Sequence, residues 1–396
     1  MQRDESVHPA LRVSIFEVMV MILNVFIRHN LSNAALQDIL RLLNVIVDRK
    51  CFPENHIQFQ KYFHHQGYTR HYVCKLCGLY IGTNQTTCTN CNSEESFFYI
   101  MLDFVSSFRE ILKRNWNDIL EYKDTIRQTS QSHISDILNA SVVKCGSVLN
   151  EISICFNTDG VKIFNSNIKR SLWPIIAIIN DLPPNLRFMR KNIMVCGIWI
   201  SYSEPEVDVF LKPFLETMKT LYYEGLDIGI SKVARVRTVA CCTDTKARCK
   251  VQKFKQFNGY NSCSYCHHPG HASESGQVKY GYVENVQRRT LTDTLQAMDI
   301  SSKTGVPVHG VKGVSPLILL PDFNVVEHCT VDVMHCVFLG VTKQLAKIWF
   351  EKPGTKYYIK QFIPEIDNVL TTINHFAESS RSARKLVDRN NWKANE

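Results

Sequence analysis

The sequence predicts a mixed α/β fold that follows a helical region and a small metal-binding module, and three observations lead to this prediction. Apolar strands and amphipathic helices alternate between residues 151 and 257. Two CxxC pairs, ten residues apart, come shortly after residue 70. The chain of 396 residues is 45% hydrophobic and 10% aromatic, a composition that suits packed cores in two or three domains.

Residues 1–66 are expected to form a helical region. Leu11–Arg28 and Ser32–Val47 carry apolar residues at helical spacing, and Ser32 is a candidate N-cap. The longest apolar run, Ile15 to Ile27, is shorter than the roughly 18–20 residues that a membrane span needs, so no membrane partner is expected. A plain helical hairpin is favoured over a helix-turn-helix DNA reader, because no basic recognition face stands out.

Residues 67–98 predict a zinc ribbon. The pattern is Cys74-x2-Cys77-x10-Cys88-x2-Cys91, and each CxxC pair supplies half of a four-thiolate tetrahedron. The first residues lack the pattern of a secretory signal. Fifteen cysteines therefore favour metal sites and buried thiols over a disulfide framework. A helical linker is expected over residues 99–147.

The α/β region begins at residue 148, and its first part extends to residue 258. Asp159 lies in a turn between two predicted strands, and Asp244 follows the last one directly. Carboxylates at strand ends can converge on a ligand and hold a pair of Mg²⁺ or Mn²⁺ ions for phosphoryl transfer. The structural alternatives are an ordinary turn at Asp159 and a helix cap at Asp244. The predicted strands and helices are Glu151–Asn157, Val161–Phe164, Asn192–Tyr202, Val207–Tyr223, Val233–Cys242 and Thr245–Phe257.

A second zinc site is predicted to brace residues 259–350, before a C-terminal helical part over residues 351–396. Cys263 and Cys266 form a third CxxC pair. His335 and Asp332, three apart on a predicted helix from Val331 to Phe350, share a face and are favoured as its remaining ligands. Asp332 is alternatively a hydrogen-bond partner of a metal-bound histidine. About two zinc ions per chain are expected. Other candidate ligands are His267, His268 and His271, and a buried structural histidine is the alternative for His335.

A net charge of +9 suits a polyanionic partner, although an ordinary basic protein would carry it as well. A group of basic residues beside Asp244 is a candidate phosphate contact, with a solvated helix face as the alternative. These residues are Lys246, Arg248, Lys250, Lys253 and Lys255.

Nine short motifs, in family order from about Val13 to the last residue, resemble the catalytic region of CACTA (En/Spm-type) DNA transposases. They are Asn157 to Phe164, Ser171 to Pro174, Asn180 to Pro184, Phe210 to Pro213, Lys255 to Gly259, Cys263 to Cys266, Gly310 to Gly313, Asp332 to Cys336 and Trp392 to Glu396. The resemblance implies an RNase H-like catalytic core that is interrupted by the zinc-braced insertion. It also implies a DNA partner, a homo-oligomer and a nuclear location.

The resemblance further implies a DDE triad that cleaves and transfers DNA strands with Mg²⁺ or Mn²⁺. Asp159 and Asp244 match the first two acids, and Glu396 is the choice for the third because of its Trp-Lys-Ala-Asn-Glu context. The chain stops at Glu396, where relatives continue, so an inactive or host-recruited remnant that serves as a zinc-dependent DNA- or protein-binding module is the alternative. A nuclease of RNase H type is a third possibility.

Overall fold

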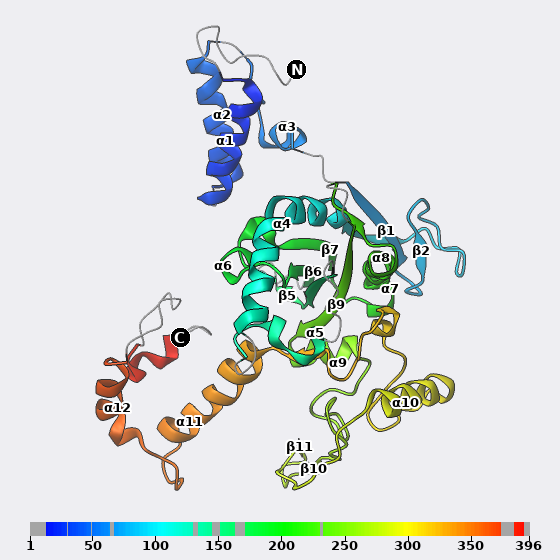
Figure 1. Ribbon diagram of the computed structural model, residues 1–396, viewed down its shortest axis with the longest axis vertical. Coiled ribbons are helices and arrows are strands. Elements are labelled where there is room, and N and C mark those ends of the chain that lie inside the picture. The colour runs from blue at the N-terminus through cyan, green and yellow to red at the C-terminus, as the bar shows by residue number, and fades with distance from the viewer. Residues whose placement is uncertain are drawn as a thin grey trace. The chain divides into compact units, whose positions relative to one another are not determined.

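The computed structural model describes residues 13–29, 31–48, 50–63, 67–129, 134–144, 151–162, 171–229, 233–373 and 384–391. The chain divides into two compact units, Met1–Gly67 and Tyr68–Glu396 (Figure 1). Among the helices of the described ranges, none is long and apolar enough to cross a membrane.

The first unit is a helical hairpin with a short third helix. Its elements are α1 (Ile15–Arg28), α2 (Asn33–Ile46) and α3 (His56–Lys61). Ser32 caps α2 by accepting a hydrogen bond from the Ala35 N–H at 3.1 Å, which confirms the predicted cap. Met19, Leu40 and Phe59 are almost completely buried in its core. Packing of the apolar helix faces therefore holds this unit together.

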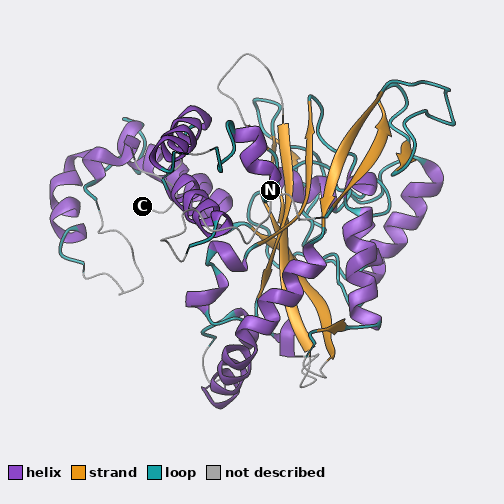
Figure 2. Cartoon of the chain, turned by 90° about the horizontal axis from the view of Figure 1, so that it is seen from above, coloured by secondary structure: helices purple, strands orange, loops and turns teal. Residues whose placement is uncertain are grey.

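The second unit is built on one curled, mixed sheet of ten described strands (Figure 2). The order is β12-β9-β4-β6-β7-β3-β1-β2, with β5 beside β6 and β8 beside β9. The mixed α/β fold predicted from the sequence is therefore confirmed. The strands are β1 (Tyr68–Cys74), β2 (Tyr80–Gly82), β3 (Ser96–Leu102), β4 (Glu151–Thr158), β5 (Val161–Lys162), β6 (Ser171–Ile179), β7 (Met194–Ser201), β8 (Leu226–Asp227), β9 (Val233–Thr243) and β12 (Cys329–Val331).

The sheet combines antiparallel and parallel pairing. β4, β6 and β7 form an antiparallel meander, and β3 and β1 continue it antiparallel from β7. β9 runs parallel to β4, and β12 runs parallel to β9. The carboxyl ends of β4, β9 and β12 therefore meet at one edge of the sheet.

Helices cover both faces of the sheet near β4. Ile152, Ile154 and Phe156 alternate along β4 and are buried in the main core, which also takes apolar residues from α4 (Phe104–Thr129), α7 (Val207–Phe210) and α8 (Lys212–Tyr223). The other face of the strand carries Cys155, which packs in a smaller cluster with Val143. That cluster is covered by the 3₁₀ helix η1 (Ile137–Asn139) and by α5 (Ser141–Lys144).

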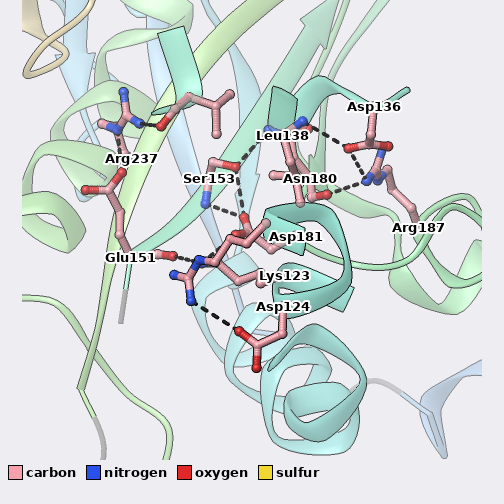
Figure 3. Close-up of polar contacts among 12 residues, drawn as sticks. Lys123, Asp124, Asp136, Leu138, Glu151, Ser153, Asn180, Asp181, Arg187 and Arg237 are labelled. Carbon is pink, nitrogen blue, oxygen red and sulfur yellow. Dashed lines mark hydrogen bonds and ion pairs between the residues drawn. The ribbon is translucent and has the colours of Figure 1, made fainter. Parts of the chain in front are cut away.

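Three ion pairs with little solvent exposure lie within the sheet and the segments that cover it (Figure 3). Asp181, which follows β6, also accepts hydrogen bonds from the Ser153 N–H and hydroxyl of β4 at 2.6 and 2.8 Å. Charges that are removed from water need this kind of complete pairing to be tolerated. The pairs are Lys123–Asp181 at 2.8 Å, Arg187–Asp136 at 2.9 Å and Arg237–Glu151 at 2.6 Å.

An insertion separates β9 from β12 in sequence. After it, the predicted helix from Val331 begins later than expected, because Cys329–Val331 pairs with β9 as a strand and Asp332 follows that strand. A π-helix, Met334–Thr342, comes next. The other elements are α6 (Pro184–Arg187), η2 (Arg190–Asn192), α9 (Thr245–Val251), β10 (His271–Ala272), β11 (Val278–Lys279), α10 (Leu291–Thr304), η3 (Pro316–Leu319), α11 (Lys343–Glu351), η5 (Lys360–Phe362), α12 (Ile363–Leu370) and η6 (Leu386–Asn391).

Candidate metal centres

Three aspartates directly follow three neighbouring parallel strands. Asp159 comes after β4, Asp244 after β9 and Asp332 after β12. Val331 pairs with Thr243, so Asp332 and Asp244 are the next residues on adjacent strands. The sheet topology thus brings together residues that lie as far as 173 positions apart (332 − 159).

The register between β4 and β9 places the first two aspartates level with each other. Phe156 pairs with Cys241, and Asp159 and Asp244 each lie three residues further along their strands. The Asn157 amide of β4 also donates to the Cys242 carbonyl of β9 at 2.5 Å. This hydrogen bond joins the two strands immediately before the acids emerge.

The aspartates form one electrostatic group with His335. Burial raises the pKa of Asp159, and the negative charges of Asp244 and Asp332 raise it further, while the Gly160 N–H and the charge of His335 oppose the shift. A bound cation would offset this repulsion between neighbouring carboxylates. Oxygen ligands of this kind suit Mg²⁺.

Asp332 and His335 form a close pair at this edge. His335 Nδ1 lies 2.7 Å from Asp332 Oδ2. Burial acts to raise the pKa of Asp332, but its hydrogen bonds with His335 and the charge of that ring hold the pKa below its ordinary value. The same hydrogen bond raises the pKa of His335. The pair therefore favours an ionised carboxylate beside an imidazolium.

Local backbone bonds orient the first two acids. Asp159 Oδ1 accepts from the Gly160 N–H at 2.6 Å, and Asp244 Oδ1 accepts from the Ala247 N–H at 2.6 Å as the N-cap of α9. The cap role weighed for Asp244 is thus present. At Asp159 the predicted second strand does not return along β4, because β5 pairs with β6 instead. Both backbone bonds engage the Oδ1 atoms, and each carboxylate has a second oxygen with which to meet a cation.

The second candidate centre is the four-cysteine cluster of the predicted ribbon. The Sγ atoms of Cys74, Cys77, Cys88 and Cys91 all lie within 4.8 Å of one another. Three of the separations are 3.5, 3.5 and 3.7 Å, close to the ~3.8 Å edge of a tetrahedron with zinc–sulfur bonds of about 2.3 Å. The cluster therefore fits zinc as a closed structural site.

Without a metal, the thiols of this cluster ionise unequally. The Ser93 N–H acts to lower the pKa of Cys91, but hydrogen bonds with Cys74, Cys88 and Cys77 and burial raise it to about 12. The Leu79 N–H donates to the Cys77 sulfur and, with hydrogen bonds from Cys88, Asn90 and Cys74, lowers the pKa of Cys77 to about 6 although burial opposes the shift. Thiolates, not thiols, bind zinc. β1 ends at Cys74, so the site is attached directly to the sheet.

Cys263 and Cys266 are not gathered with Asp332 and His335 into a comparable group. Among the described residues, only the ribbon cysteines bring three or more potential ligand atoms within 4.8 Å, so the aspartates at the strand ends are more widely spaced as well. The carbonyls of Cys263 and Cys266 instead accept from the buried Arg289 Nε at 2.8 and 3.2 Å, whereas Asp332 belongs to the strand edge. The same arginine donates to the His309 carbonyl at 2.6 Å.

We therefore expect zinc-loaded protein to retain about one zinc per chain through the ribbon. Cys88→Ser should release this zinc, because it removes one corner of the tetrahedron, whereas Cys263→Ser should leave the zinc content unchanged. Elemental analysis after dialysis against a weak chelator measures both. A second equivalent that is lost only in Cys263→Ser would show that the insertion has a zinc site of its own.

Most of the basic residues predicted to contact phosphate bind groups within the protein. Lys246 and Lys250 both pair with Glu204, at 2.6 and 3.0 Å, and Lys253 pairs with Asp208 at 2.6 Å. Arg248 is buried, and its guanidinium stacks on Tyr265. Lys255 is half-buried, and its backbone N–H donates to the Gly310 carbonyl. DNA would have to compete with these contacts.

Glu396, the predicted third acid, lies outside the described residues. The sequence did not predict that Asp332 lies with Asp159 and Asp244 at the carboxyl ends of β4, β9 and β12, here called the carboxylate edge. The signal was the pair of β-branched residues Thr330 and Val331, which lie in a strand although the predicted helix begins at Val331. Sequence reasoning also missed Asn157 and Glu204, whose roles depend on partners far away in sequence.

A family described as a protein of unknown function (DUF1258) matches residues 58–305, more than half of the chain. The match spans the ribbon cysteines, Asp159, Asp244 and the third CxxC pair, and it ends before Asp332. The chain matches no curated protein. A function must therefore be argued from the two candidate centres.

Proposed function

Because the chain belongs to the DUF1258 family, which is described only as of unknown function, we propose its activity from the carboxylate edge: a DDE-type DNA transposase that cleaves and transfers DNA strands. The observation that carries the proposal is the meeting of Asp159 and Asp244 at the carboxyl ends of adjacent parallel strands. Polar side chains at such ends are placed to act on a common ligand.

The sheet supports an RNase H-like core. Five consecutive strands are ordered β7-β6-β4-β9-β12, with an antiparallel meander first in sequence and two parallel strands after it. An RNase H-like sheet has this order and these directions. The core also explains why the first acid follows the first of these strands and the second acid follows the fourth.

In the proposed reaction Asp159 and Asp244 hold Mg²⁺ or Mn²⁺ at the scissile phosphate. When bound, such ions activate the attacking oxygen and stabilise the leaving oxygen of an in-line displacement. A water oxygen attacks phosphorus first and the 3′-oxygen leaves, which yields a 3′-hydroxyl and a 5′-phosphate. That 3′-hydroxyl then attacks a phosphodiester of the target strand and displaces its 3′-oxygen.

The third acid is proposed to be Glu396, on the resemblance of its Trp-Lys-Ala-Asn-Glu context. Asp332 supplies a further carboxylate at the same edge. The ribbon is proposed to hold a structural zinc, because β1 and β3 join the sheet through β7 and so link the metal site to the core. A homo-oligomer is proposed, since transposition joins two ends of an element. A nuclear location is proposed from the resemblance to DNA transposases.

A strand-transfer assay tests this function. Zinc-loaded protein is incubated with duplex DNA that carries the terminal repeats flanking its gene, together with a supercoiled target plasmid and Mg²⁺ or Mn²⁺. We expect nicks at the element ends and a covalently joined product, both abolished by EDTA. Nicks without joined product would indicate a nuclease. Duplex binding without any cleavage would indicate the catalytically inactive binding module.

A further inference from the structure

Trp173 of β6 supports the turn that carries Asp159. Its side chain is 3% exposed. A Cβ atom added to Gly160 would lie 2.9 Å from the Trp173 Cε2 atom and 3.0 Å from its Cζ2 and Nε1 atoms. The backbone beside the catalytic acid therefore rests directly on the indole, and only glycine permits this approach.

The same indole meets the helix that follows Asp244. Lys250 of α9 places its Nζ 5.5 Å from the centre of the Trp173 ring, a cation–π contact. Lys250 also pairs with Glu204, and Glu204 pairs with Lys246. Lys246 lies in the first turn of α9, two residues after the Asp244 that caps this helix.

We propose that Trp173, Lys250, Glu204 and Lys246 form a clamp that sets the position of Asp159 relative to Asp244, with Trp173 as its main positioning residue. The clamp joins the Asp159 turn, through the indole, to the helix that Asp244 caps. This inference rests on the proposed function, in which the two acids share divalent cations. It assigns the basic residues of α9 to the geometry of the acids and away from phosphate contact.

The sheet offers a matched control for Trp173. Trp199 of β7 is the direct partner of Trp173 in the β6–β7 register, and it is equally buried, at 2% exposed. It packs against Tyr99 of β3 and Phe210 of α7. Trp173→Phe and Trp199→Phe remove the same ring atoms at neighbouring buried sites, and only the first removes atoms that touch Gly160. Trp199→Phe also removes a hydrogen bond, because the Trp199 Nε1 donates to the Ser203 carbonyl at 3.3 Å.

The experiment measures Mn²⁺ binding to zinc-loaded protein by electron paramagnetic resonance, beside the melting temperature of each variant. We expect both phenylalanine variants to lower the melting temperature, and only Trp173→Phe to weaken Mn²⁺ binding, by roughly 10-fold, the lower end of the range for groups that orient metal ligands. Equal Mn²⁺ affinity in the two variants would overturn the clamp. Absence of Mn²⁺ binding in the wild-type protein would overturn the proposed function as well.

Glu204 provides a second test that leaves the core intact. Glu204→Gln removes the charge that holds Lys246 and Lys250, while Glu206→Gln changes an exposed carboxylate two residues away. We expect weaker Mn²⁺ binding in Glu204→Gln and an unchanged affinity in Glu206→Gln. Gly160→Ala should act like Trp173→Phe, and the double variant should bind better than Gly160→Ala alone because phenylalanine leaves room for the new Cβ. Additive losses in the double variant would contradict contact between the two residues.

Discussion

Replacing Asp159 or Asp244 by asparagine is expected to reduce metal-dependent DNA cleavage by on the order of 10³-fold, because a lost metal ligand removes several kcal/mol of transition-state stabilisation and each 1.36 kcal/mol is tenfold in rate. The two acids sit at the same level on adjacent strands, so neither can replace the other. Initial rates of nicking on a labelled duplex measure the effect.

Two further variants serve as comparisons for the loss of Asp159 or Asp244. Asp332→Asn is expected to cost less, about 10- to 100-fold, if Asp332 acts by orienting its neighbours. Asp299→Asn, on an exposed helical ion pair with Lys303, should leave cleavage unchanged. Full activity in Asp244→Asn would remove the acid from the catalytic machinery and would contradict the proposal.

The same Asp159→Asn variant should be more stable than the wild-type protein when divalent cations are absent. The pKa of Asp159 is raised by burial and by the charges of Asp244 and Asp332, so its ionised form opposes folding at neutral pH. The stability gained with asparagine should disappear as the pH falls below the pKa that Asp159 has in the unfolded chain. Below that pH the wild-type carboxyl is protonated in both the folded and the unfolded state. Thermal melts at neutral and acidic pH with EDTA check the sign.

Breaking the buried pair between Arg187 and Asp136 is expected to give the largest loss of stability among the changes considered. Their side chains are 6% and 7% exposed, and the guanidinium also donates to the Leu182 and Asn180 carbonyls. Arg187→Leu leaves the Asp136 carboxylate buried without its cation, which typically costs about 3–5 kcal/mol. The free energy of unfolding in urea measures the loss.

The control for this prediction is an exposed pair of the same kind. Lys303 and Asp299 form an ion pair on α10 with side chains 72% and 59% exposed. Lys303→Ala should change the free energy of unfolding by about 0–1 kcal/mol, because solvent screens such pairs. Similar losses in Arg187→Leu and Lys303→Ala would mean that the buried network does not fasten the covering segments to the sheet.

Local patterns predicted the parts of this fold that depend on local chemistry. Alternation predicted β4, the long apolar run predicted β9, and the spacing of the cysteines predicted a cluster that the structure forms. β6 was not predicted, because Pro174 interrupts its pattern although the strand pairs on both sides. β12 is three residues long, and only its pairing with β9 identifies it.

In the candidate metal centres, too, local sequence predicts some residues, and strand pairing alone places the others. Asp159 and Asp244 could be recognised because each ends a predicted strand, whereas the place of Asp332 depends on that unpredicted pairing. Spacing along a helix grouped Asp332 and His335 with Cys263 and Cys266. The sheet instead places the first pair beside Asp159, and Arg289 binds the second within the insertion. Strand pairing therefore decides which acids lie at the same end of the sheet.

Direct measurement of divalent-cation binding tests the central claim, that Asp159 and Asp244 share a metal site. Zinc-loaded wild-type protein and the Asp159→Asn/Asp244→Asn double variant are titrated with Mn²⁺, and free Mn²⁺ is followed by electron paramagnetic resonance. The account predicts saturable binding to the wild-type protein, competed by Mg²⁺, and its loss in the double variant with the ribbon zinc retained. Equal Mn²⁺ binding by the two proteins would contradict it.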